Sequence, residues 1–391
     1  MNLTMSSLKA GKDKCQQLES LKDLMMQSDK ADLLAEIRSL ESAFDQCISV
    51  LERVHDIRDS LESFGYSDQW FDTINAGGSL EGIVEFDMPK LFDNKANKTQ
   101  ACMEGLWDTI KEWLLKAYNF LKSVILKIRD FVHWLLEKLG LCTSKKIGAL
   151  DYAVKQGYGM MQAYFQQCGI DLQNFYDPDE LVRYEMYLKA IVGTIFNRIR
   201  ANISKEDISD RNLLKHEDIR KDFYNRLTVA CKENGIELNN IEKVGYTIEY
   251  TPGSSKFLRT LGFATTGKDF KQTTIAIETV DDFVAKALEP LKKIDANFKA
   301  SASLIKFVQN TIATDHASLG DSLNQMRANN MSEDIVVITQ ANVINQACCL
   351  SVVTDALNFF AEIQKRVAHN VNLLEAIIDV STGKRKPPVQ Q

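Results

Sequence analysis

The hydrophobic residues between positions 105 and 139 recur at alternating steps of three and four, which is the spacing of one stripe along an α-helix. Polar residues fall opposite the stripe, at about 100° per residue. Three of the four tryptophans of the chain lie in this segment. The pattern predicts one long amphipathic helix whose apolar stripe consists of Trp107, Ile110, Leu114, Ala117, Leu121, Val124, Ile128, Phe131 and Leu135.

This predicted helix has two interpretations. It is either a core helix whose stripe packs in a bundle, or an interfacial membrane helix with tryptophans at the boundary. A membrane-spanning helix is disfavoured, because Lys116, Lys122 and Lys127 interrupt the apolar residues every few positions. The candidate membrane or partner face consists of Trp107, Trp113, Leu114, Leu121, Ile128, Phe131, Trp134 and Leu135.

Residues 1–65 predict a helical hairpin. Apolar residues recur at helical spacing before and after Ser28-Asp29, two residues that favour the start of a new helix. The second part keeps nearly heptad steps, as a coiled coil does. Gly65 predicts its end, because glycine takes a positive φ without steric cost.

The pattern changes over residues 66–104. Gly77-Gly78, Pro89 and a polar run rich in Asn and Lys leave little sustained helical spacing. This segment is predicted to be a linker or extended arm that leads into the amphipathic helix, residues 105–140.

Residues 141–300 are predicted to form an α+β domain. A short polar break at residues 141–146 opens it, and Asp177 with Pro178 at the next position forms a good helix start. Helices are predicted over residues 147–168, 178–203 and 211–234.

Two later runs alternate with period two and are rich in β-branched and aromatic residues, as strands are. They are residues 244–250 and 273–278, and we expect them to pair. The segment between them has neither a P-loop nor the G-x-G-x-x-G spacing, so it gives no indication of a phosphate site.

The last third returns to helical spacing. Helices are predicted over residues 280–300, 303–328 and 333–380. Residues 301–380 form the predicted C-terminal long helices, and residues 381–391 a disordered basic tail. The sequence therefore predicts a mainly α fold, a long-helix bundle with a small two-stranded β element.

Composition and charge narrow the function classes. The chain has 391 residues and a net charge of −6, which gives no indication of a specific nucleic-acid partner. Its eight cysteines lack C-x-x-C or Cys/His ligand spacing, so we expect reduced thiols, with no metal and no cofactor. Residues 1–30 hold no continuous apolar run of the signal-peptide kind, which indicates synthesis in a cytoplasm.

Candidate catalytic groups are sparse in the sequence. The five histidines lie far apart. Asp315 and His316 are neighbours, as are His216 and Glu217, but adjacent helical residues point in different directions. We expect both pairs on solvated surface. Neither G-x-S-x-G nor H-E-x-x-H occurs. The chain is therefore predicted not to be an enzyme. An unrecognised enzyme is the least favoured of three function classes, and the other two are described below.

The stretch KTQACMEG, residues 98–105, follows the Gly-containing linker and leads directly into the long amphipathic helix. This arrangement, over roughly residues 30–140, resembles the internal head proteins and other structural virion proteins of tailed bacteriophages. The resemblance implies cleavage after a glutamate by a head-maturation protease. The implied processing candidates are the Glu104-Gly105 bond and Glu81.

Two functions from different classes follow as expectations. The resemblance implies a non-enzymatic virion structural protein, made in the host cytoplasm, that pairs its helices with other virion proteins or with itself. The alternative is a membrane-active helical protein, pore-forming or injected, that meets a membrane surface through residues 105–139.

Overall fold

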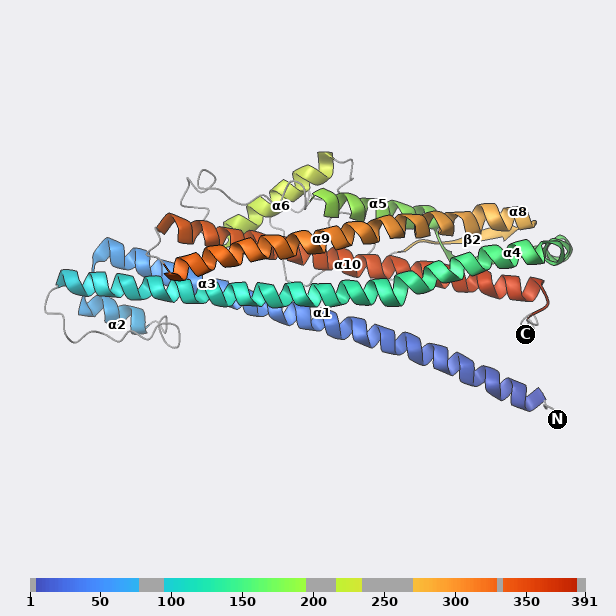
Figure 1. Ribbon diagram of the computed structural model, residues 1–391, viewed down its shortest axis with the longest axis horizontal. Helices are drawn as coiled ribbons and strands as arrows, with labels where there is room; N and C mark the ends of the chain where they lie inside the picture. The colour runs from blue at the N-terminus through green and yellow to red at the C-terminus, as the bar shows by residue number, and fades with distance from the viewer. Residues whose placement is uncertain (1–4, 77–94, 195–215, 234–269, 329–332, 385–391) are drawn as a thin grey trace.

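The computed structural model describes residues 5–76, 95–194, 216–233, 270–328 and 333–384. Figure 1 shows an elongated bundle in which long helices run side by side along the long axis. A two-stranded antiparallel sheet lies among the described residues. The predicted fold class, mainly α with a small two-stranded β element, is confirmed.

The first elements, from α1 to α5, lie in the N-terminal half of the chain. Its elements are α1 (Met5–Phe64), α2 (Asp68–Ala76), α3 (Lys95–Trp134), the π-helical turn η1 (Leu135–Gly140), α4 (Leu141–Cys168), β1 (Ile170–Tyr176) and α5 (Pro178–Thr194). The later elements are α6 (His216–Glu233), β2 (Gln272–Ile277), α8 (Val280–Phe283), the π-helical turn η6 (Val284–Leu288), α9 (Glu289–Ala328) and α10 (Glu333–Ser381).

One uninterrupted helix, α1, replaces the predicted hairpin of residues 1–65. Ser28 and Asp29 lie inside it. Both residues cost only tenths of a kcal/mol in a helix interior, whereas a proline would cost about 3, and no proline occurs before residue 89. The predicted end is confirmed: Gly65 has a φ of 68°, and its N–H donates to the Leu61 carbonyl at 2.8 Å.

The predicted arm, residues 66–104, is also partly wrong. It contains α2 and the first ten residues of α3, which begins at Lys95. Gly77-Gly78 and Pro89 lie outside the described residues. The apolar residues that pack α2 and the start of α3 onto the core include Tyr66, Trp70 and Cys102, all of them buried.

The predicted polar break at residues 141–146 is helical instead, so α3, η1 and α4 form one continuous rod over residues 95–168. Its polar side chains find partners on neighbouring helices. Ser144 Oγ donates to Asp295 Oδ2 of α9 at 3.2 Å, and Lys146 Nζ donates to Asn372 Oδ1 of α10 at 2.9 Å. Tertiary contacts of this kind override weak local propensity. The predicted boundary between residues 140 and 141 falls inside this rod.

The sheet pairs β1 with β2 antiparallel, with Ile170 opposite Ile277 and Tyr176 opposite Gln272. The predicted strand at residues 273–278 is confirmed within one residue at each end, but its partner in the structure is β1. The other predicted strand, residues 244–250, lies outside the described residues. The β1 strand is irregular between Leu172 and Phe175, where Asn174 has a φ of 56°, a conformation that asparagine tolerates better than most residues.

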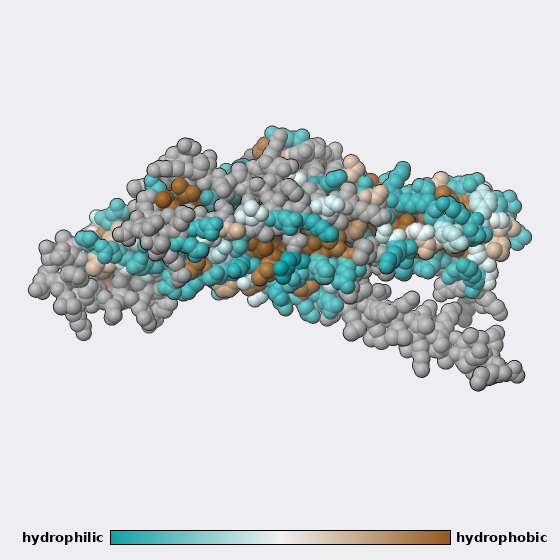
Figure 2. Space-filling view, in the orientation of Figure 1, coloured by the Kyte–Doolittle hydropathy of each residue, from teal (hydrophilic) through white to brown (hydrophobic). Residues whose placement is uncertain are grey.

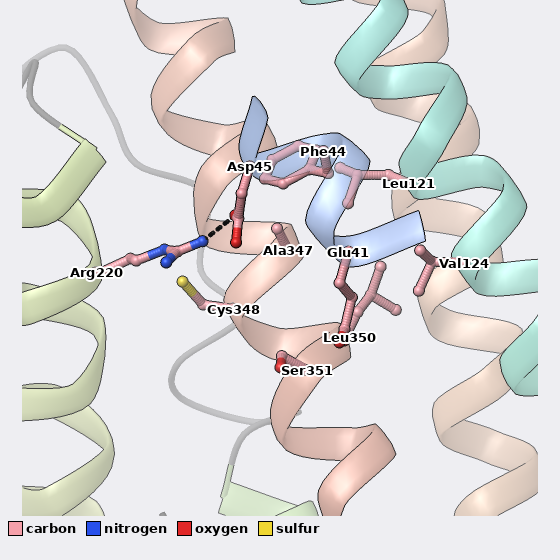
Figure 3. Close-up of a pocket in the computed structure, with 10 residues that line it drawn as sticks. All are labelled: Glu41, Phe44, Asp45, Leu121, Val124, Arg220, Ala347, Cys348, Leu350 and Ser351. Carbon is pink, nitrogen blue, oxygen red and sulfur yellow. Dashed lines mark hydrogen bonds and ion pairs between the residues drawn. The ribbon is translucent and has the colours of Figure 1, made fainter. Parts of the chain in front are cut away.

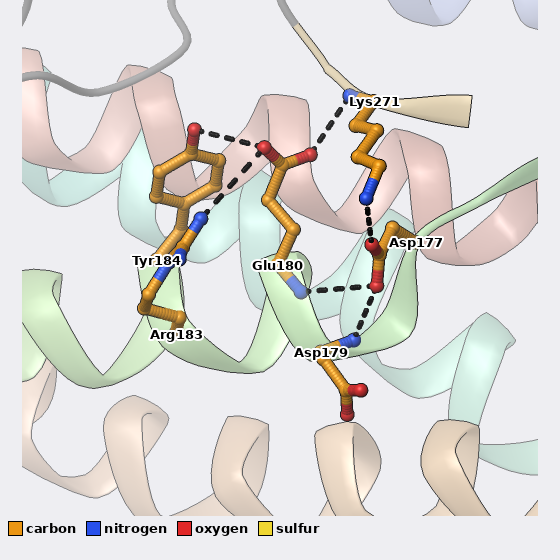
Figure 4. Close-up of polar contacts among 6 residues, drawn as sticks. All are labelled: Asp177, Asp179, Glu180, Arg183, Tyr184 and Lys271. Atoms are coloured by element: carbon orange, nitrogen blue, oxygen red, sulfur yellow. Dashed lines mark hydrogen bonds and ion pairs between the residues drawn. The ribbon is translucent and has the colours of Figure 1, made fainter. Parts of the chain in front are cut away.

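A polar cluster joins the start of α5 to the start of β2 (Figure 4). Asp177 Oδ1 accepts from the backbone N–H groups of Asp179 at 3.0 Å and Glu180 at 3.4 Å, which confirms it as the predicted helix cap. Glu180 Oε2 accepts from the N–H of Lys271 at 2.8 Å, and Lys271 Nζ lies 3.4 Å from Asp177 Oδ2. The cluster satisfies backbone donors at both ends, so we interpret it as structural.

The last helices are longer than predicted. The chain stays helical from Val280 to Ala328, without the predicted break between residues 300 and 303. The helix predicted over residues 333–380 is confirmed as α10, which packs against α3, α4, α5, α6, α9 and β1. Of the described helices α10 alone is long and apolar enough to cross a membrane, and 72% of its most apolar window is buried in the bundle.

The bundle has one connected apolar core to which α1, α3, α4, α5, α6, α9 and α10 all contribute. Figure 2 shows that hydrophilic residues cover most of the coloured surface on the viewed face, with hydrophobic patches along the middle of the bundle. The described segments therefore fold around a shared interior.

Candidate functional site

The candidate membrane or partner face of α3 is mostly an internal surface. Trp107 and Trp113 are half-buried, and cations cover their rings: the Arg58 guanidinium lies 4.8 Å from the Trp107 ring centre and Lys116 Nζ lies 4.2 Å from that of Trp113. The other predicted residues are buried, namely Leu114, Leu121, Ile128, Phe131, Trp134 and Leu135. Since α1 packs along α3, the face has a cover within the same chain.

The processing candidate Glu104-Gly105 lies in the third turn of α3, because the helix begins ten residues earlier than predicted. Glu104 is exposed, and its Oε1 accepts from Gln100 Nε2 at 3.2 Å. Thr109 Oγ1 donates to the Gly105 carbonyl at 2.9 Å. A protease needs an extended segment, so cleavage here requires local unwinding. Glu81 lies outside the described residues.

His316 is buried, which corrects the expectation of a solvated histidine. Its ring stacks on that of Tyr118, with centroids 4.2 Å apart, and the Tyr118 hydroxyl donates to the His316 carbonyl at 3.1 Å. Burial lowers the pKa of the imidazole, which favours the neutral ring. We interpret His316 as a packing residue between α3 and α9.

Ionisable and apolar side chains together line a small pocket where α1, α3, α6 and α10 meet (Figure 3). Helix α3 contributes only apolar groups to it, whereas the other three helices contribute polar ones. Its lining consists of Glu41, Phe44, Asp45, Leu121, Val124, Arg220, Ala347, Cys348, Leu350 and Ser351.

An ion pair closes one side of the pocket. Arg220 of α6 binds the carboxylate of Asp45 of α1 through its Nη2 atom. Burial raises the pKa of Asp45, and the guanidinium opposes that shift. Cys348 beside this pair is buried, which raises the pKa of its thiol to about 12. A thiol with so high a pKa is a poor nucleophile at neutral pH.

Burial also raises the pKa values of two carboxyl groups in or near the pocket, Glu41 and Asp355. Burial raises the pKa of Glu41 to about 7, the Ser351 hydroxyl opposes the shift and the nearby Asp45 adds to it. Burial raises the pKa of Asp355 to about 8, and the nearby Glu41 adds to it. Asp355 is 6% exposed. Both groups therefore change charge near neutral pH.

A third such carboxyl lies elsewhere in the bundle. Glu185 of α5 is 1% exposed, and burial raises its pKa to about 8, with Lys189 opposing the shift and Asp295 adding to it. The helices α5 and α9 pack against each other here. Glu185 is thus chemically similar to the pocket carboxyls but lies in another interface.

The sequence patterns did not single out these carboxyls, although a signal is present. Asp355 lies four residues after Ser351 and four before Phe359, in the most apolar helix of the chain. Glu41 lies four residues after Ile37 and three before Phe44, both buried. An acidic residue at a stripe position of a core helix indicates a buried charge that needs explanation.

Within the described ranges, no group of three or more His, Cys, Asp or Glu side chains is arranged to hold a metal ion.

In comparisons with known proteins, no family model, curated protein or solved structure matches this chain.

Proposed function

We propose that the chain is a non-enzymatic structural protein of a bacteriophage particle, in the internal head or otherwise particle-associated, that acts through helix–helix association. The supporting observation is the course of α1, which has 60 residues and so spans about 90 Å. Figure 1 shows its N-terminal part diverging from the rod of α3 and α4.

A helix that leaves its bundle needs another partner. Isolated helices in water are marginally stable, and most helical stability in proteins comes from tertiary packing. The first described side chain of α1 that is buried is Leu34, while the sequence before it carries apolar residues at helical spacing. A second copy of this chain or another virion protein would supply the packing.

The sequence resemblance over residues 30–140 supports the particle as the location. Synthesis in the host cytoplasm and a place in the virion follow from it as parts of the same proposal. The partners are other virion proteins or further copies of this chain, and neither a nucleic acid nor a cofactor is needed for the proposed association.

One observation favours a second candidate function. Helix α10 has the length and composition to cross a membrane, so a membrane-active protein is the alternative. Its insertion element would be α10 or the face of α3, and both lie mostly inside the bundle. Insertion would therefore require the bundle to open first, whereas association through α1 requires no such opening.

Mass spectrometry of purified particles tests the virion proposal, because it requires the chain to be present in them. A matched pair, the full chain and a variant lacking residues 1–28, then tests the role of α1. We expect the variant to keep its thermal unfolding temperature but to lose incorporation and self-association, measured by light scattering. Absence of the full chain from particles would refute the proposal, and equal incorporation of both would refute the role of α1.

A further inference from the structure

Helix α1 contacts α10 and α3 through different kinds of residues. Apolar residues dominate its packing on α3, but polar pairs connect it to α10. Lys30 Nζ donates to Glu362 Oε1 at 2.7 Å, and His55 Nε2 lies 2.7 Å from Gln340 Oε1. As the residue number rises along α1, that of its partner falls along α10, so the helices run antiparallel.

Between these two pairs along the helices lie two carboxyl groups, Glu41 of the pocket lining on α1 and Asp355 near the pocket on α10. Neither oxygen of Glu41 nor Oδ2 of Asp355 has a hydrogen-bond partner of normal geometry. A buried carboxylate without partners is strongly unfavourable, whereas the neutral acid is tolerated. A charge on Glu41 further disfavours ionisation of Asp355 across this interface.

The remaining charged groups around the pair do not neutralise it. On α1, Arg38 favours the ionised forms of both carboxyls and Asp45 opposes ionisation of Glu41. Arg220 of α6 also favours ionisation of Glu41, but it is bound to Asp45. Helix α3 presents only apolar side chains to the pocket, Leu121 and Val124. Ionisation of both carboxyls thus leaves like charges in an apolar surrounding.

We propose that Glu41 and Asp355 form a proton-controlled latch that holds α1 on α10 while the two carboxyls are neutral and releases it when they ionise. Separation of α1 from α10 alone is the least costly response, because water can replace the polar pairs that join these two helices while the apolar packing of α1 on α3 is kept. An apolar interface such as that of α10 with α4 has no such substitute. Separation of α1 from α10 opens the pocket to water at Cys348 and Ser351 of α10.

The direction of the pH dependence follows from the raised pKa values. Both carboxyls are neutral in the docked state below about pH 6, and both ionise as the pH passes 7 to 8. The latch is therefore closed in weak acid and opens in weak alkali. Glu185 ionises over a similar range, but the charged groups that act on it, Lys189 and Asp295, lie on α5 and α9, so it provides a matched control.

Native cysteines report the state of the latch. Cys47 and Cys348 are both buried, and burial raises the pKa of each thiol. Cys348 on α10 lines the pocket and reports separation from α1. Cys47 on α1 lies near Lys116 of α3 and reports separation of α1 from α3. Pulsed alkylation with mass spectrometric readout measures their exposure in the full chain. The Glu41→Gln/Asp355→Asn variant provides the reference at each pH, which cancels the ordinary pH dependence of thiol reactivity.

We expect Cys348 to label at the same rate in the wild-type and variant proteins at pH 6, and at least tenfold faster in the wild type than in the variant at pH 9. The Glu185→Gln protein should label as the wild type does at both pH values. Equal rates in wild type and variant at pH 9 would overturn the latch. If the Glu185→Gln protein labels more slowly than the wild type at pH 9, the latch is also overturned. The opening would then depend on a carboxyl outside the latch and would be global unfolding. If the double variant does not fold, Glu41→Gln alone takes its place and must lower the pH 9 rate.

Discussion

A single buried leucine shows how strongly the α1–α3 interface depends on apolar contacts. Leu121 is 2% exposed, whereas Leu126, five residues later on the same helix, is 43% exposed. We expect Leu121→Ala to lower the free energy of unfolding by about 2–5 kcal/mol, because it removes buried methyl groups and leaves a cavity. Leu126→Ala should change it by less than about 1 kcal/mol. Urea unfolding followed by circular dichroism measures both, and equal effects would contradict the described burial.

The buried carboxyl of Glu185 makes stability depend on pH in a definite direction. Its pKa is raised in the folded chain to about 8, so the folded state binds the proton more tightly than the unfolded state does. Ionisation of Glu185 therefore lowers the free energy of unfolding. This loss is absent below the ordinary pKa of glutamate, grows as the pH rises, and reaches its full size above about pH 8.

Glu185→Gln should therefore raise the free energy of unfolding at pH 8, by on the order of 2 kcal/mol, and leave it nearly unchanged at pH 4.5. Chemical unfolding at the two pH values measures the difference. The exposed Glu104 provides the control, since Glu104→Gln should have no effect at either pH. A Glu185→Gln protein that is less stable than wild type at pH 8 would show that the carboxylate has a partner.

For individual residues, the sequence predicted the burial of apolar side chains better than that of polar ones. The stripe of α3 is buried almost throughout, because a 3.6-residue period directly reports which side of a helix faces the core. The burial of Glu41, Asp355 and His316 depends instead on which helix lies opposite, and residue spacing within one helix does not contain that information.

At the scale of whole elements, helices were recognised but their ends were not. Ser28-Asp29 and residues 141–146 look like breaks, yet the helices continue through both. Weak helix formers interrupt a helix only when no tertiary contact favours it, and here α9 and α10 bind the polar groups of Ser144 and Lys146. Gly65 ended α1 as predicted because its positive φ is a local requirement.

Two glycine substitutions test this distinction. Gly65 has a φ of 68° after the last turn of α1, so Gly65→Ala should destabilise the chain by about 1–2 kcal/mol, the cost of a left-handed residue with a Cβ. Gly148 lies inside α4, and a Cβ added there would meet no atom within 4 Å, so Gly148→Ala should stabilise the chain by about 0.5–1 kcal/mol. Thermal unfolding compares them, and a shift of the same sign in both would contradict the assignment.

The strand β1 shows why the β element was only half predicted. Its sequence, IDLQNFY, contains one β-branched residue and an asparagine in the left-handed region. Its extended form depends on pairing with β2, about 100 residues away in the chain. Asn370 of α10 adds to this, because its Nδ2 donates to the Tyr176 carbonyl and its Oδ1 accepts from the Tyr176 N–H, each at 2.9 Å.

At the scale of the whole molecule, the covering of α3 by α1 links the processing and membrane hypotheses. Cleavage after Glu104 would separate residues 1–104, including all of α1, from the rest. Dissociation of the released α1 would then uncover the apolar face of α3, and a large exposed apolar surface normally binds a partner, a membrane or itself. The same bond is part of a continuous helix in the intact fold, so its cleavage is coupled to opening of the structure.

We therefore expect the Glu104-Gly105 bond to be protected in the folded chain and cut when the fold is loosened. A glutamate-specific protease, followed by N-terminal sequencing, should release a fragment starting at Gly105 at least tenfold faster from Leu121→Ala than from wild type, because proteolysis follows the population of open forms. The exposed Leu126→Ala provides the control and should be cut at the wild-type rate. Equal rates in all three proteins would mean that the bond is accessible in the native fold, and processing in assembled particles would then need no prior opening.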